Sequence, residues 1–201
     1  MDINRKDHLI ISNIVKKNSR VLDIGCADGT LLKMLKSEKN ISGQGIEIDY
    51  RKVEICLRKG LSVVEGDANN EITNFPDHSF DYVILSQTLQ TVSKPKWVLN
   101  EILRIGKHAI ISFPNFGHWL CRLQLFLLGK MPVTQDLKLS WYDTQNIHLC
   151  TMRDFFELLS QMQLNSTQVY GITKNKKIIQ TKKSLLNIFA AHAVLLVEKS
   201  N

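Results

Sequence analysis

The feature that most constrains the fold is a regular alternation of short apolar runs with segments of helical periodicity. The apolar runs cover residues 20–24, 42–48, 61–65, 80–85 and 107–113. Helical spacing appears before and between them, over 5–17, 31–35, 50–59 and 95–104. Strands that alternate with helices indicate βαβ units, in which right-handed crossovers place helices on both faces of a parallel sheet. The sequence therefore predicts an α/β domain with a mostly parallel sheet.

Residues 115–150 break this alternation. The segment contains Gly117, Gly129 and Pro132 together with several aromatic residues. We expect an insertion with one helix over 119–128, followed by a loop, that forms a cap or a partner surface. No linker composition or internal repeat divides the chain, so residues 1–201 are expected to form a single domain.

The last fifty residues predict one helix and two strands. The helix covers 154–163, and Thr151 with Asp154 resembles a capping box at its start. The strands cover 166–172 and 191–198, and a lysine-rich hairpin connection is expected over 173–186.

Composition narrows the function classes. The formal net charge is +7, and a basic balance admits nucleic-acid partners. The one lysine cluster lacks interleaved aromatic residues, so we interpret it as a solvated surface loop; it contains Lys174, Lys176, Lys177, Lys182 and Lys183.

The four cysteines form no CxxC pair, which argues against a metal site and a disulfide framework. No signal-like N-terminus or run of about 18 apolar residues occurs, so a cytoplasmic protein without a membrane span is expected.

The turn after the first predicted strand favours a phosphate-free ligand. Gly25 and Gly29 allow a ligand or a helix to approach the backbone closely. A dinucleotide-binding turn would carry glycine where Ala27 and Thr30 stand, and no P-loop motif occurs. Asp23 and Asp28 would repel a pyrophosphate and suit a ligand with a sulfonium and an ammonium group.

Further acidic residues follow the next two strands. Glu47 ends the second strand, where a carboxylate can accept hydrogen bonds from ribose hydroxyls. Asp67 follows the third strand and could accept from an adenine amino group. Singly, Asp23 and Asp28 could be helix caps and Glu47 a solvated strand end. Three carboxylates at three consecutive strand ends favour a nucleoside-binding cleft instead.

These motifs resemble the class I S-adenosylmethionine-dependent methyltransferases. Residues 21–29 (VLDIGCADG) look like their first motif, 45–47 like the following acidic motif, and 80–83 like their fourth strand. Their pattern usually has glycine where Ala27 sits. The resemblance implies a Rossmann-like sheet with an antiparallel last strand and S-adenosylmethionine (SAM) as cofactor.

A closer resemblance, over essentially the whole chain, is to the MetW family of methionine biosynthesis. It is carried by residues 81–90, 111–119, 129–134 and 141–151. It implies a homoserine O-acyltransferase as partner. It also implies site roles: Asp23, Gly25 and Cys26 beside the methionine moiety, Glu47 at the ribose, Asp67 and Ala68 beside adenine, and Ser86 and Thr88 under the sulfonium.

The catalytic assignment is less constrained, because methyl transfer needs a general base only when the acceptor must lose a proton. The candidates lie in the insertion: His118, Tyr142, His148 and Asp143. His148 could instead be structural, and Trp119, Trp141 and Tyr142 could form an acceptor wall, a core or an interface. Gln90 occupies a position that often carries histidine in small-molecule methyltransferases.

Three functional hypotheses follow. The first is a small-molecule methyltransferase in methionine biosynthesis. The second is a non-catalytic SAM sensor that acts on a homoserine O-acyltransferase. The third, RNA methylation, rests only on the positive charge and is ranked last.

Overall fold

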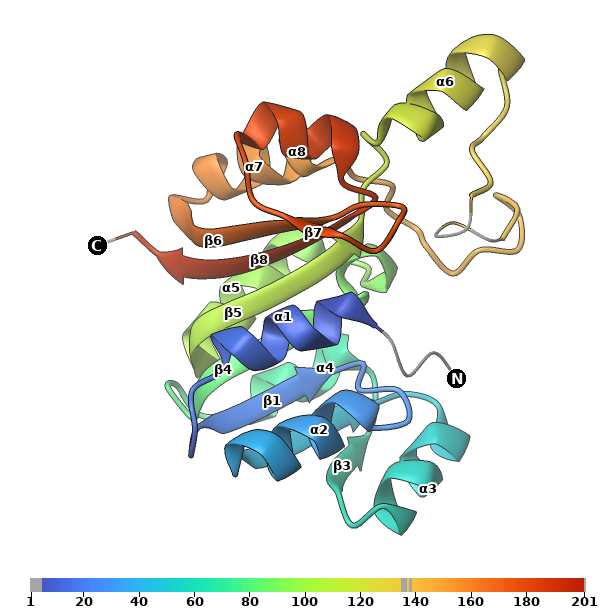
Figure 1. Cartoon of the computed structure of the whole chain (residues 1–201). Helices are drawn as coiled ribbons and strands as arrows, with labels where there is room; N and C mark the ends of the chain where they lie inside the picture. The colour runs from blue at the N-terminus through green and yellow to red at the C-terminus, as the bar shows by residue number, and fades with distance from the viewer. Residues whose placement is uncertain (1–4, 135–136, 138, 201) are drawn as a thin grey trace.

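The chain folds around one mixed sheet, shown in Figure 1. The structure is a computed structural model and describes residues 5–134, 137 and 139–200. Within these residues the strand order is β3-β2-β1-β4-β5-β8-β6-β7. The strands are β1 (Arg20–Ile24), β2 (Ser42–Glu47), β3 (Ser62–Glu65), β4 (Phe80–Ser86), β5 (Gly106–Pro114), β6 (Leu164–Ile172), β7 (Ile178–Ile179) and β8 (His192–Lys199).

The strand directions match the prediction. Strands β1 to β5 pair in parallel, whereas β8 is antiparallel to β5 and to β6. The mostly parallel sheet and the antiparallel last strand are therefore confirmed.

Helices cover both faces of the sheet, as predicted. They are α1 (Lys6–Ile14), α2 (Thr30–Lys39), α3 (Tyr50–Arg58), α4 (Ala68–Glu71), α5 (Pro95–Ile105), α6 (Trp119–Leu128), α7 (Met152–Gln161) and α8 (Lys183–Phe189), with short 3₁₀ turns at Ile72–Asn74 (η1) and Leu89–Thr91 (η2). One core cluster joins α1, α2 and α3 to the sheet, and the other joins α5, α7 and α8. Strand β8 contributes side chains to both clusters, because its alternate residues point to opposite faces of the sheet.

The C-terminal part departs from the prediction in one place. The expected hairpin connection is present from Thr173 to β7, which pairs with β6. From Lys183 onward the prediction is wrong, since helix α8 forms there. Its Leu186 is buried in the core. The lysines around this short apolar segment led to the prediction of a loop there. The capping box predicted at Thr151 and Asp154 is confirmed.

Helix α6 projects from the body of the molecule (Figure 1). It forms over the predicted residues and ends at Gly129 in the left-handed conformation. Positions 135, 136 and 138 of the expected insertion lie outside the described residues. None of the described helices is long and apolar enough to cross a membrane.

Candidate functional site

A cleft of about 520 Å³ opens at the carboxyl ends of β1, β2, β3 and β4. Strand register produces it: Asp23 pairs with Gly45 and Glu47 with Glu65, so the strand ends meet at one edge. This edge is where open parallel sheets bind ligands. Six predicted cofactor-binding residues line the cleft: Gly25, Glu47, Asp67, Ala68, Ser86 and Thr88.

The turn after β1 adopts a backbone that favours glycine. Gly25 has φ +71° and Ala27 has φ +50°. The Gly25 and Cys26 amides both donate to the Ile46 carbonyl, at 2.8 and 3.1 Å. A Cβ atom on Gly25 would lie 2.6 Å from Thr88 Oγ1. The turn therefore brings bare backbone to the cleft, with Thr88 packed directly against it.

Glu47 is held by this turn. Its Oε2 accepts a 2.8 Å hydrogen bond from the Ala27 amide, and its Oε1 accepts a 3.0 Å bond from the Asp49 amide. Only 5% of the residue is exposed. Because each carboxylate oxygen can accept a second bond, Glu47 is both a clamp on the turn and an acceptor facing the cleft.

Asp67 begins helix α4. Its Oδ1 accepts from the Asn69 amide at 2.9 Å and from the Asn69 side chain at 2.8 Å. Asp67 is thus a helix cap that also lines the cleft, next to Ala68.

Arg5 is a cleft residue that the sequence did not reveal. Its guanidinium pairs with Asp7 and donates a 3.0 Å hydrogen bond to Ser86 Oγ. Arg5 precedes α1, and no local motif indicates that it would reach the end of β4. A cation therefore stands beside the acidic cleft.

Asp23 lies behind the cleft and does not line it. The residue is 1% exposed, and its Oδ1 has no hydrogen-bond partner among the described residues. Burial raises the pKa of Asp23 to about 7; Arg5 opposes this rise, and Glu47 adds to it. A buried acceptor without a partner is costly, and a cationic ligand nearby would stabilise its charged form.

Two other residues of the turn point elsewhere. Asp28 pairs with Lys59 Nζ at 2.8 Å and with the Thr30 hydroxyl, so it does not face the cleft. Cys26 is buried against Gly45 and Leu32, and burial raises the pKa of its thiol. Neither is among the lining residues.

The predicted catalytic residues lie outside the cleft. His118 is buried and caps α6, with Nδ1 accepting from the Leu120 amide at 3.3 Å. Tyr142 is exposed and contacts Trp141 edge to face. His148 is exposed, and its backbone amide donates to the Gln90 carbonyl at 3.1 Å. The structure therefore places no predicted base at the cleft.

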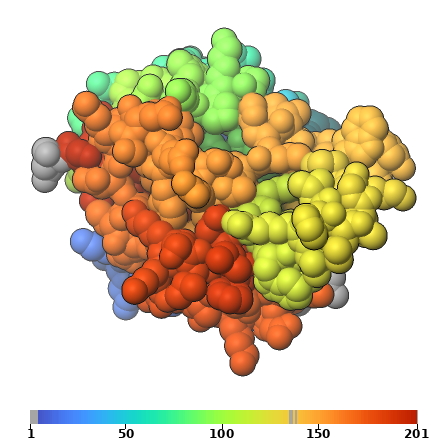
Figure 2. All heavy atoms as spheres, turned by 90° about the horizontal axis from the view of Figure 1, so that it is seen from above, coloured from blue at the N-terminus to red at the C-terminus, as the bar shows by residue number. Residues whose placement is uncertain are grey.

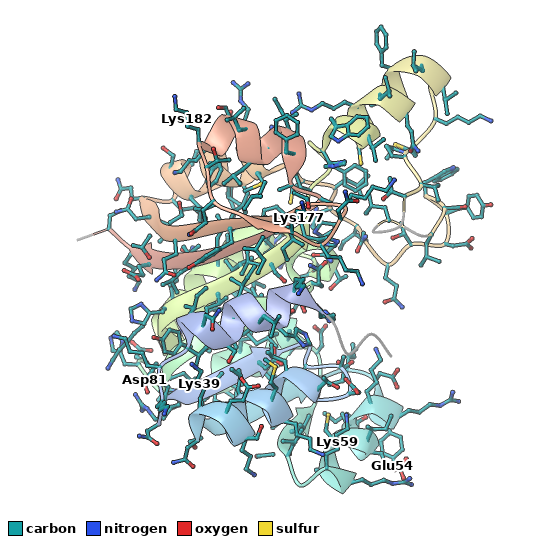
Figure 3. The ribbon with its side chains drawn as sticks, in the orientation of Figure 1. Lys39, Glu54, Lys59, Asp81, Lys177 and Lys182 are labelled. Carbon is teal, nitrogen blue, oxygen red and sulfur yellow. The ribbon has the colours of Figure 1, made fainter. Side chains whose placement is uncertain are left out.

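Figure 3 shows Lys177 beside β7 and Lys182 at the start of α8, at separate places on the molecule. Over the described ranges, no group of three histidine, cysteine or acidic side chains could hold a metal ion.

Comparisons with known proteins agree with this geometry. A family model for "Methionine biosynthesis protein MetW" matches residues 5–197. The "Bifunctional methionine biosynthesis protein MetXA/MetW" of Rhodopirellula baltica is 34% identical over 167 residues, which is 79% of this chain and 27% of that protein. A demethylmenaquinone methyltransferase of Listeria monocytogenes is 31% identical over 134 residues, 59% of this chain and 56% of that protein. The chain thus spans only part of each relative's length.

The fold is that of the SAM-dependent methyltransferases. A solved SAM-dependent methyltransferase from Thermotoga maritima superposes with a TM-score of 0.71 over 97% of this chain and 88% of its own. The identity is 18%, so this likeness establishes the fold and not the reaction.

Proposed function

Since the chain belongs to the MetW family of methionine biosynthesis proteins, we propose that it binds SAM in the cleft at Gly25 and methylates a small molecule. The observation that carries this proposal is that Glu47 and Asp67 line the cleft, with Asp23 buried behind them. Carboxylates stand at three strand ends, and the turn lacks the glycine pattern that accommodates a pyrophosphate.

The residues present fit such a ligand. Glu47 would accept from the ribose hydroxyls and Asp67 from the adenine amino group. The unpartnered Oδ1 of Asp23 would stabilise the positive charge of the methionine end. Arg5, already directed at Ser86, would meet the carboxylate of that end.

Little acid–base chemistry is required of the protein. Bound SAM would supply an electrophilic methyl group. The chain's own contribution is to hold an acceptor in line with that methyl, and positioning alone can lower a barrier by several kcal/mol. The absence of the predicted bases from the cleft is compatible with this mode of catalysis.

Replacing Glu47 by glutamine tests the ribose assignment. The change keeps the shape of the side chain and removes its charge, and a charged hydrogen bond contributes about 1.5–3 kcal/mol. We expect SAM affinity, measured by isothermal titration, to fall about tenfold. Glu65→Gln is the matched control, because Glu65 is the exposed register partner on β3. No SAM binding by the unaltered protein, or equal affinities of both variants, would count against the proposal.

A second role, as a partner of homoserine O-acyltransferase, is favoured by helix α6. Its residues Leu125 to Leu128 are all exposed, and Phe126 is 85% exposed. Contiguous exposed apolar side chains are typical of interaction sites, so the end of this helix indicates a partner surface. The Rhodopirellula relative, which joins MetXA and MetW units in one chain, supports an acyltransferase as that partner.

Polar substitution of this helix tests the partner role. We expect the double variant Phe126→Gln, Leu127→Gln to lose co-elution with a co-expressed homoserine O-acyltransferase in gel filtration. Leu57→Gln, on exposed α3, should leave it intact. Separate elution of the unaltered proteins, with acyltransferase activity unchanged, would refute this role.

A further inference from the structure

A second cavity of about 630 Å³ adjoins the proposed cofactor cleft. The two share Gln87, Thr91 and Gln145 as lining residues. The second cavity's other walls come from the segment after β5, including Phe116, Trp141, Ile147 and Leu149. In Figure 2 this segment, from α6 onward, runs as yellow to orange atoms along one side of the molecule.

The wall formed by the insertion is fastened to the turn after β4. The amides of Ile147 and His148 both donate to the Gln90 carbonyl, at 2.9 and 3.1 Å. The Gln90 side chain donates in turn to the Gln87 carbonyl at 2.8 Å. Gln87 lies between Ser86 and Thr88, which line the cofactor cleft. The cavity therefore begins where the methyl group of the proposed cofactor would be presented.

The lining chemistry selects among ligands. The walls combine apolar side chains with the amides and hydroxyls of Gln87, Thr91, Thr144, Gln145 and Asn146. Asp143 is the one ionisable side chain among the described lining residues, and no cation lines the cavity there. An anionic ligand would find no charge partner among the described lining residues, and a charge moved out of water without one is costly.

We propose that this cavity is the methyl-acceptor site, and that its ligand is an uncharged, largely apolar molecule bearing a lone-pair donor. The volume lies within the range of about 300–1,000 Å³ typical of small-molecule sites. This inference rests on the methyl-transfer function proposed above, and it argues against free carboxylates and phosphate monoesters, which are anionic, as acceptors.

Methyl transfer to such an acceptor needs no further reagent. The acceptor's lone pair forms the new bond to the methyl carbon, and the electrons of the broken sulfur–carbon bond remain on sulfur as a neutral thioether. The positive charge passes to the acceptor, whose proton then leaves to water. Asp143 stabilises that developing charge, as fixed opposite charges do in preorganised sites.

A pair of fluorescent probes tests the charge preference. N-phenyl-1-naphthylamine is neutral, and 1-anilinonaphthalene-8-sulfonate adds one sulfonate to the same ring system. We expect the neutral probe to bind at least tenfold more tightly, with or without saturating SAM. The protein's net charge of +7 favours the anion elsewhere, so this preference must be local to the cavity. Equal or tighter binding of the sulfonate would overturn the inference.

Substitutions in the cavity wall show where the neutral probe binds. Ile147→Gln, Leu149→Gln should weaken binding of the neutral probe at least fivefold, whereas Phe126→Gln on α6 should not change it. Asp143→Asn should reduce the ratio of the two probes' affinities at least threefold. Asp143 is exposed. Probe binding that depends on Phe126 and not on the cavity residues would overturn the inference. SAM titration is separate: its failure overturns the proposed function, whereas failure of the probe pattern with intact SAM binding overturns this inference alone.

Discussion

Gly25→Ala is expected to lower SAM affinity at least 100-fold and to destabilise the fold. The added Cβ would lie 2.6 Å from Thr88 Oγ1 and 2.9 Å from its Cγ2, closer than such atoms pack. The φ of +71° also disfavours any L side chain, by about 1–2 kcal/mol. Overpacking adds about 1–3 kcal/mol. Thr88 must move, and the backbone at the cleft must move with it.

Gly60→Ala separates these two contributions. Gly60 has the same φ of +71°, but a Cβ there would meet no atom within 4 Å. We expect this variant to lose only the conformational part, and to bind SAM with unchanged affinity. Thermal denaturation and isothermal titration of both variants make the measurement. If Gly25→Ala behaves like Gly60→Ala in both, the contact with Thr88 does not shape a cofactor site.

Asp23→Asn is expected to stabilise the free protein at neutral pH and to weaken SAM binding about 30-fold or more. Burial raises the pKa of Asp23 to about 7, so holding it charged in the free protein is unfavourable. One pKa unit corresponds to about 1.4 kcal/mol, so a rise from the ordinary value of 3.8 to about 7 sets an upper bound of about 4 kcal/mol on the expected gain. The same substitution removes the buried negative charge that would lie behind the sulfonium. Opposite signs for stability and affinity distinguish this role from a structural one.

The pH dependence has a defined direction. Between the usual aspartate pKa and about 7, the folded protein binds more protons than the unfolded chain, so the contribution of Asp23 to stability falls as pH rises through this window. The stability difference between Asp23→Asn and the unaltered protein should therefore be small at pH 4 and largest above pH 7. SAM affinity of the unaltered protein should rise from pH 5.5 to 7.5, since a cationic ligand favours the carboxylate.

Denaturation in urea at several pH values, with SAM titrations at the same values, measures both trends. Asp81→Asn serves as a control, because Asp81 sits at the start of β4, away from the cleft, and pairs with Arg20 and Lys107. Figure 3 shows Asp81 at the left of the sheet, where β4 begins. A SAM affinity that does not change over this pH range would argue against Asp23 as the charge partner.

Strand ends were predictable because parallel strands place their carboxyl ends at one edge. Gly25, Glu47 and Asp67 each follow or end a strand, so the pattern alone brings them to one cleft. Side-chain direction within a turn is not encoded in this way. Asp28 and Cys26 stand beside Gly25 in sequence, yet one pairs with Lys59 and the other packs against Gly45.

Residues from distant segments were the least predictable. Arg5 reaches Ser86 through tertiary packing of the segment before α1, which no local motif records. His118 was a catalytic candidate because it lies in the insertion. The structure uses it to cap α6, a role that depends on where the helix begins.

The hydrogen bonds that hold Glu47 affect how the protein would distinguish SAM from its demethylated product. Because two backbone amides fix this carboxylate in place, its contacts with the sugar would be the same for both molecules. The two molecules would then be distinguished at the methionine end of the cleft, where only SAM carries a positive charge on sulfur. Under the proposed function, the buried charge of Asp23 would therefore contribute to the preference for the charged donor.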